Sequence, residues 1–337
     1  MTSATPEACD PLERFDTLYR RAAPGWRERL RHFRATHAPQ TLMVKGQPWR
    51  YLTGGQGPRL ALLLHGSESD AESLFGAMNL LERGYRVIAP TYPAEVESVE
   101  AACDGLAALI ESAGAPALVI GYSMGGYLAQ SLAARRPELV ARLALCNTGG
   151  PARSALRMVR AQYAAFSAVP GPLLPVALRA GVALPLWREA PDVCGANLIF
   201  WRVYLAEMTA RLSKRAVLAH GRITADFLRG SLRPPAALAA DPGRVLILNA
   251  TADHTIEADE RDLLRLLYPA AASRSLQARG HLSFLTQPAP FIEAIERAMR
   301  PEALTKASAA HEWSADDQRA AVRAHQQRSS APRSAMS

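Results

Sequence analysis

The 337-residue sequence contains only four cysteines, and they lie far apart. It therefore has neither the close cysteine spacing of a structural zinc site nor the density of a disulfide framework. This scarcity favours reduced thiols in a cytoplasmic protein. The four residues are Cys9, Cys103, Cys146 and Cys194.

The sequence also lacks an uninterrupted apolar run long enough to cross a membrane, which takes about 18 residues or more. The best candidate, FSAVPGPLLPVALRAGVALPLW, is interrupted by four prolines and by Arg179. The first residues, MTSATPEACDPLERF, carry acidic side chains and have no apolar centre. They do not have the pattern of a secretory signal. We therefore expect a globular protein without a transmembrane segment.

Positive charge is abundant, but only in one part of the chain. The net charge is +8, and residues 150–240 contain twelve Lys and Arg against four Asp and Glu, which accounts for all of it. No nucleic-acid-binding motif accompanies this charge, so we expect no nucleic-acid partner. Two interpretations stay open. The arginines are solvated on helix faces, or they attract an anionic ligand.

Short apolar runs alternate with helical stretches along most of the chain. Continuous apolar runs are typical of strands buried on both faces of a sheet. Their alternation with helices predicts a mostly parallel sheet with helices on both faces, an α/β fold. The predicted strands are 41–44, 49–53, 59–66, 85–90, 116–123, 142–148, 244–250 and SRSLQA, and the predicted helices are about 70–83, 95–113, 125–136, 257–268 and 289–299.

The same pattern divides the chain into segments. Residues 1–40 are charged and predicted to be a helical extension, whereas 41–149 and 241–300 form the core. Residues 150–240 show several helical stretches with Pro-rich joints and no clear buried strand, so we expect a helical cap inserted into the core. Residues 301–337 are rich in Ala, Ser, Gln and Arg and lack an apolar stripe, which predicts a largely disordered tail.

The stretch LVIGYSMGGYLAQ, residues 118–130, holds a serine between a predicted strand and a predicted helix. A sharp strand-to-helix turn is crowded, and Gly121 and Gly125 would relieve that crowding. The hydroxyl of Ser123 would then stand at a helix N-terminus, where negative charge is favoured. This context predicts a nucleophile; the alternative is a turn serine without chemical function.

A serine needs a base that takes its proton and an acid that orients the base. His281 follows the last predicted strand in ARGHLSFL, and Asp253 follows another strand end in LILNATADHTI. The order Ser, Asp, His along the chain favours Asp253 as the acid and His281 as the base. His254 is the competing histidine, and Glu257 and Asp259 are the competing acids.

Acyl chemistry also requires donors for a developing oxyanion. The backbone N–H of Met124, directly after the serine, is one expected donor. The second should come from the loop after LLLHG, most simply from Ser67. His65 would then be a structural residue that shapes this loop.

The segments LLLHG, GYSMGG, NATADHT and GHLSF together resemble those of the α/β-hydrolase superfamily over residues 40–300. In that superfamily an insertion such as 150–240 lies over the strand ends that hold the nucleophile. The resemblance implies that its apolar underside lines an acyl pocket and that its arginines ring the entrance. An acyl substrate with an anionic group would suit such a pocket.

A closer resemblance is to maspardin and its bacterial relatives. It rests on HFRATHAPQ, GYRVIAPTYP, CDGL, GGYLAQSLA, LALCNT and LYPAAASRSL. Maspardin is better known as a binding protein than as an enzyme, and its segment matching GHLSF lacks a clear histidine. The presence of His281 here argues for a complete catalytic set.

The sequence thus predicts a serine hydrolase that cleaves an ester or thioester of a small molecule through an acyl-enzyme, with no metal or organic cofactor. Another acyl or C–C bond cleavage by the same residues is an alternative within the enzymes. A maspardin-like binding or adaptor protein with a vestigial pocket is the alternative from another class.

Overall fold

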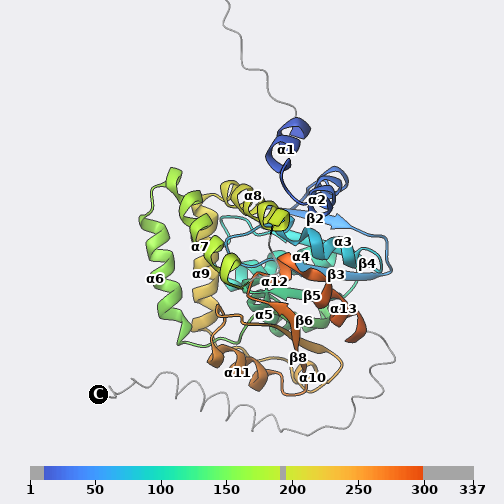
Figure 1. The fold of residues 1–337 in the computed structure, drawn as a ribbon. Helices are drawn as coiled ribbons and strands as arrows, with labels where there is room; N and C mark the ends of the chain where they lie inside the picture. Colours follow the sequence, from blue (N-terminus) through green and yellow to red (C-terminus); the bar gives the residue numbers. More distant parts are fainter. Residues whose placement is uncertain (1–10, 190–194, 299–337) are drawn as a thin grey trace, which may run out of the picture.

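A computed structural model describes residues 11–189 and 195–298, which are coloured in Figure 1. The segment 301–337 lies outside the described residues, so the predicted disorder of the tail stays a prediction.

An eight-stranded sheet forms the centre of the molecule, with the strand order β1-β2-β4-β3-β5-β6-β7-β8. Strands β3 to β8 run parallel to one another, whereas β2 is antiparallel to both β1 and β4. The mostly parallel sheet predicted from the apolar runs is therefore confirmed. The strands are β1 (Gln40–Val44), β2 (Gln47–Gly54), β3 (Arg59–Leu64), β4 (Tyr85–Thr91), β5 (Ala117–Tyr122), β6 (Val140–Cys146), β7 (Val245–Thr251) and β8 (Ala272–Arg279).

The continuous apolar runs are explained by burial of both sheet faces. Alternate residues of one strand belong to different cores: Leu63 packs in the core with α3 and α13, and Leu62 in the core with α4, α5 and α11. Successive side chains of a strand point to opposite faces of the sheet, which produces this division. These helices are α3 (Phe75–Leu81), α4 (Val99–Ala113), α5 (Met124–Arg135), α11 (Ala258–Leu267) and α13 (Pro288–Ala298).

Among the described residues, five α-helices and the short 3₁₀ helix Gly171–Leu173 lie between β6 and β7. Helices α6 to α9 occupy the left and upper part of Figure 1, and α10 lies in its lower part near α11. Helix α6 packs against α9, and α7 packs against α8. Within the described part of this insertion there is no strand. The helices are α6 (Ala155–Ala168), α7 (Leu174–Glu189), α8 (Gly195–Arg211), α9 (Lys214–Arg229) and α10 (Ala236–Ala239).

Several basic residues of this insertion pair with acidic residues of the segment between β3 and α4. The Arg211 guanidinium lies 3.0 Å from a carboxylate oxygen of Asp70, and that of Arg215 lies 3.1 Å from Glu95. Arg222 likewise contacts Glu97. Some of the basic side chains in this insertion therefore form ion pairs that connect it to the core.

Two N-terminal helices, α1 (Pro11–Tyr19) and α2 (Pro24–Thr36), pack on α8, and α2 also contacts α3. Trp26 lies edge-on to Trp201 of α8, with 5.0 Å between ring centroids. Tyr19 donates a 2.6 Å hydrogen bond to Glu207 of the same helix. Across residues 11–189 and 195–298, no helix combines the length and apolarity that a membrane span requires.

Candidate active site

Ser123 connects β5 to α5 in a backbone conformation that few residues adopt. Its φ is +53° and its ψ is −124°. Positive φ in a residue with a Cβ is uncommon and strained, and strain of this kind concentrates at functional sites. The backbone around it is held by bonds from Ser123 N to Cys146 O (3.1 Å) and from Gly126 N to Ser123 O (2.8 Å). The turn therefore presents one hydroxyl at the end of the sheet.

The two glycines of the motif are required by close backbone contacts. A Cβ on Gly121 would lie 2.4 Å from the carbonyl oxygen of Gly125. A Cβ on Gly125 would lie 2.3 Å from the carbonyl oxygen of Leu64. Neither position has room for any side chain, which is the physical basis of the Gly-x-Ser-x-Gly pattern.

The structure brings Ser123, His281 and Asp253 together from the ends of three different strands. His281 Nε2 lies 3.0 Å from Ser123 Oγ, and His281 Nδ1 lies 3.0 Å from Asp253 Oδ2. Both distances allow hydrogen bonds. With the Nδ1 proton directed at the carboxylate, Nε2 can accept the proton of the serine.

The carboxyl group of Asp253 is stabilised in its ionised form. Burial opposes ionisation, but His281 and the N–H groups of Thr255 and Ile256 outweigh it and hold the pKa below its ordinary value. The two N–H groups lie 2.9 and 3.4 Å from Asp253 Oδ1. The acid therefore stays negative beside the histidine at neutral pH.

Two residues that the sequence patterns did not single out hold the backbone of His281. Tyr122 OH donates to the His281 carbonyl oxygen at 3.1 Å, and Asn147 Nδ2 donates to the same oxygen at 2.9 Å. Asn147 has a φ of +44° and also accepts from Ala250 N at 2.8 Å. Asn147 lies near the end of the predicted strand 142–148, and a polar residue at a strand end is the sequence signal that could have indicated it.

The competing residues lie elsewhere. His254 is exposed. Glu257 begins α11 in a capping box with Glu260, and Asp259 accepts a hydrogen bond from Ser154. None of these contacts involves His281 or Ser123.

The loop after β3 lies against the serine. A Cβ on Gly66 would be 3.1 Å from Ser123 Cβ, and Ser67 follows directly. Met124 is the first residue of α5, and the first N–H groups of a helix have no acceptor within it. His65 is fully buried, stacks on Tyr92 with 4.0 Å between centroids, and contacts the Gly66 carbonyl oxygen through Nδ1 at 2.7 Å.

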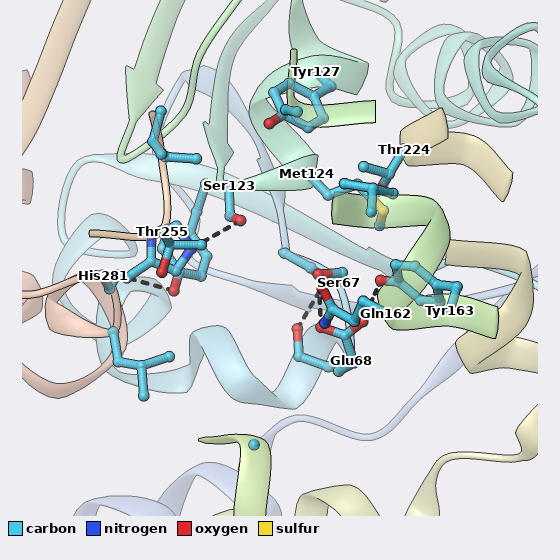
Figure 2. A pocket seen from close by; sticks show the side chains of 18 of the residues that line it. Ser67, Glu68, Ser123, Met124, Tyr127, Gln162, Tyr163, Thr224, Thr255 and His281 are labelled. Atoms are coloured by element: carbon cyan, nitrogen blue, oxygen red, sulfur yellow. Dashed lines mark hydrogen bonds between the residues drawn. The ribbon is translucent and has the colours of Figure 1, made fainter. Parts of the chain in front are cut away.

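A cavity of about 270 Å³ opens beside Ser123 between the sheet ends and the inserted helices (Figure 2). Its wall is mostly apolar, with polar groups near the serine and on α6. Among the described residues that line it there is no lysine or arginine. The lining side chains that matter below are Ser67, Glu68, Ser123, Met124, Tyr127, Met158, Val159, Tyr163, Leu205, Met208, Glu260, His281 and Leu285.

Two acidic residues contribute to this wall. Glu260 is 2% exposed, and burial raises its pKa to about 7. Tyr127 OH donates to it at 2.8 Å. Burial likewise raises the pKa of Glu68. In the described part of the chain, no three His, Cys, Asp or Glu side chains are grouped to hold a metal ion.

The sequence pattern of the alpha/beta hydrolase family matches residues 61–294. An uncharacterized protein of Mycobacterium tuberculosis is 26% identical over 300 residues, which cover 81% of this chain and 85% of that protein. The structure of an enol-lactonase from Burkholderia xenovorans has a TM-score of 0.63 at 19% identity and covers 77% of this chain and 99% of its own. A thermophilic esterase from Thermogutta terrifontis has a TM-score of 0.60 at 20% identity, with coverages of 81% and 100%. These likenesses confirm the predicted fold class.

Proposed function

The chain belongs to the alpha/beta hydrolase family, and from this premise we propose that it is a serine hydrolase acting on a carboxylic ester or thioester. One observation carries the proposal: His281 lies within hydrogen-bond distance of both Ser123 Oγ and Asp253 Oδ2, at 3.0 Å in each case. Ser123 and His281 line the cavity. A nucleophile, a base and an orienting acid in this geometry are the requirements of acyl transfer.

In the proposed reaction, Ser123 Oγ attacks the acyl carbonyl carbon while His281 Nε2 takes the hydroxyl proton. The N–H groups of Met124 and Ser67 stabilise the oxyanion that forms. The imidazolium then donates its proton to the departing alcohol or thiol, which leaves an ester of Ser123. Water then attacks this ester while the same nitrogen takes its proton, and the imidazolium returns that proton to Ser123 Oγ as the carboxylic acid leaves. Asp253 keeps the imidazole oriented throughout.

The apolar residues of the cavity wall favour a substrate with a moderately apolar acyl group. Met158, Val159 and Leu205 line it, and burial of apolar area contributes about 25 cal/mol per Å². We propose that residues 150–240 act as a cap that supplies this wall. An enol-lactonase and an esterase share the fold, and both names describe cleavage of acyl–oxygen bonds.

An anionic substrate receives less support from the cavity. Its described lining has acidic side chains but no lysine or arginine, and the cap's Arg211, Arg215 and Arg222 pair with acids of the core. We therefore propose a neutral acyl group inside. An anionic leaving group outside the cavity remains the competing hypothesis, and it predicts that kcat/KM for acyl-CoA falls with salt while that for a neutral ester does not.

The maspardin-like alternative makes a different prediction. We propose that the likeness in HFRATHAPQ and the other motifs marks relatedness in sequence and not a loss of catalysis. The support is that His281 is present and bonded to Ser123. A non-catalytic adaptor would have no need of this contact.

The test is a screen of p-nitrophenyl esters of increasing acyl length, run beside acyl-CoA thioesters, with the parent protein and Ser123→Ala. We expect turnover of at least one series by the parent and none above background by the variant. Absence of turnover across both series, or equal turnover by both proteins, would contradict the proposal.

A further inference from the structure

The loop that carries the proposed oxyanion donor Ser67 is held by contacts that the proposed reaction does not use. They converge on the next residue, Glu68, which lies between β3 and α3. Glu68 has a φ of +50°. Residues with a Cβ rarely occupy this region, and they stay there only when the surroundings restrain them. The surroundings of Glu68 must therefore hold it in this conformation.

Two helices of the insertion supply the restraints. Tyr163 of α6 donates its hydroxyl proton to Glu68 Oε1. His220 of α9 accepts a hydrogen bond at its Nδ1 from the backbone N–H of Glu68, at 3.2 Å. The other carboxylate oxygen, Oε2, accepts from the hydroxyl of Ser67 at 2.8 Å. Figure 2 shows Ser67, Glu68 and Tyr163 together at the side of the cavity away from His281.

The partners of Glu68 are themselves fixed. The ring of Tyr163 lies so close to α9 that a Cβ on Gly221 would be 2.3 Å from it. His220 is 2% exposed, with its ring 5.7 Å from that of His65 and 5.9 Å from that of Tyr92. Burial lowers the pKa of His220 to about 3, so its neutral ring can accept at Nδ1.

We propose that Glu68 is a positioning residue through which α6 and α9 fix the oxyanion loop, so that the Ser67 N–H is aimed at the substrate. The inference rests on the proposed function, because it assigns a purpose to the loop only if Ser123 forms an acyl-enzyme. A substrate-binding purpose for Glu68 fits less well, since both carboxylate oxygens already accept hydrogen bonds from Tyr163 and Ser67.

The expected size of the effect follows from what one oxyanion donor contributes. Removing such a donor costs about 100- to 1,000-fold in kcat. Loss of one restraint would displace the donor without removing it. We therefore expect about a tenfold loss when the Tyr163–Glu68 bond alone is broken.

The experiment compares Tyr163→Phe with Tyr19→Phe. Both remove one tyrosine hydroxyl that donates to a glutamate, but Tyr19 bonds to Glu207 and does not line the cavity. Phenylalanine keeps the ring that packs on Gly221. We expect Tyr163→Phe to lower kcat about tenfold with KM within about twofold, and Tyr19→Phe to leave both unchanged. Melting temperatures of the two variants should fall by similar amounts.

A transition-state analogue separates positioning from general damage. A trifluoromethyl ketone adds to the serine as a tetrahedral oxyanion, so its Ki for Tyr163→Phe should rise by the same factor as kcat/KM falls. Glu68→Gln should show the same pattern, because an amide cannot accept at both of its terminal atoms. The double variant should lose little beyond the worse single variant, as expected for groups that act as a unit.

The outcomes are distinct. If Ser123→Ala keeps its activity, the proposed function fails. If Ser123→Ala is inactive but Tyr163→Phe and Glu68→Gln match Tyr19→Phe in kcat and Ki, only the positioning inference is overturned. A fall in kcat without a matching rise in Ki would overturn it too.

Discussion

The cavity has two walls that are built in different ways. The core wall carries Ser123 and His281 on loops at the ends of parallel strands, with Asp253 bonded to His281, whereas the cap wall consists of residues of α6, α7, α8 and α9. Main-chain bonds hold the loops of the core wall, including Gly280 N to Thr251 O at 2.7 Å and Asn147 N to Leu248 O at 2.9 Å. The core wall is therefore fixed by the fold itself.

The cap wall is joined to the core largely by side chains. The Arg215–Glu95 pair is exposed by 63% and 37%, and the Arg222–Glu97 pair by 53% and 42%. Exposed pairs of this kind contribute about 0–1 kcal/mol each. We therefore propose that the chemistry depends on the core wall, while the cap wall sets the volume of the cavity and the position of the oxyanion loop.

Ser123→Ala should abolish turnover, with kcat lower by about 10⁵- to 10⁶-fold, as for other serine nucleophiles. The fold should be retained, because the substitution removes one hydroxyl and keeps the Cβ. Ester hydrolysis and melting temperature measured on the same sample check both parts. A variant with more than a few per cent of the parent's activity would remove Ser123 from the mechanism.

The next effect separates two histidines. His281→Ala should lose about 10⁴-fold or more in kcat, because no base remains for Ser123. His254→Ala is the matched control, since this exposed histidine lies one residue from Asp253. We expect its activity to stay within about twofold of the parent's. Activity lost by His254→Ala and kept by His281→Ala would reverse the assignment.

Asp253→Asn should lower kcat by about 10³- to 10⁴-fold, which is less than for Ser123→Ala or His281→Ala. The base remains in this variant, but its orientation and tautomer are disturbed. Asp259→Asn, on the neighbouring helix, serves as the control and should be nearly neutral. Steady-state kinetics on one ester decide the order. Equal losses for both variants would mean that the acid has been assigned wrongly.

The core wall should also show a pH effect on stability through Glu260. Its pKa is raised to about 7 from 4.5, so its contribution to stability is complete below about pH 4.5 and is lost as the pH rises through 7. The loss is on the order of 3 kcal/mol, since each pKa unit corresponds to about 1.36 kcal/mol. Glu260→Gln should flatten the melting temperature between pH 5 and pH 8. An unchanged slope would contradict this reading of Glu260.

The smallest effect belongs to the surface of the cap. Arg215→Gln should change the free energy of unfolding by less than about 1 kcal/mol and leave kcat within about twofold, because its pair with Glu95 is exposed. Denaturant unfolding and ester kinetics measure both. A large loss of activity would show that the cap's ion pairs influence the chemistry and would break the division between the two walls.

The two walls also differ in how far sequence could predict them. Core-wall chemistry follows local rules: the strand–turn–helix context of Ser123 and the chain order of Asp253 and His281 suffice to nominate them. Asn147 was missed because its bonds reach residues 103 and 134 positions away. Glu68, Tyr163 and His220 lie on three separate elements, and no periodicity or spacing shows that they meet.

The strands themselves were predictable because burial on both faces leaves continuous apolar runs, and the predicted ranges agree with the observed strands to within a few residues. The ion pairs of the cap were not predictable from the sequence. Composition located the excess charge in 150–240 but not its partners at Asp70, Glu95 and Glu97. Long-range pairing of charged side chains depends on the tertiary fold, which local patterns do not specify.

We propose above all that Ser123 is a nucleophile activated by His281. Labelling with a fluorophosphonate, followed by mass spectrometry of the proteolysed protein, tests it most directly, because the probe reacts with activated serines and needs no knowledge of the substrate. We predict one adduct, on the peptide containing Ser123, which is lost in His281→Ala and retained in His254→Ala. An adduct on another residue, or equal labelling of Ser123 in His281→Ala, would show that Ser123 is not a nucleophile activated by His281.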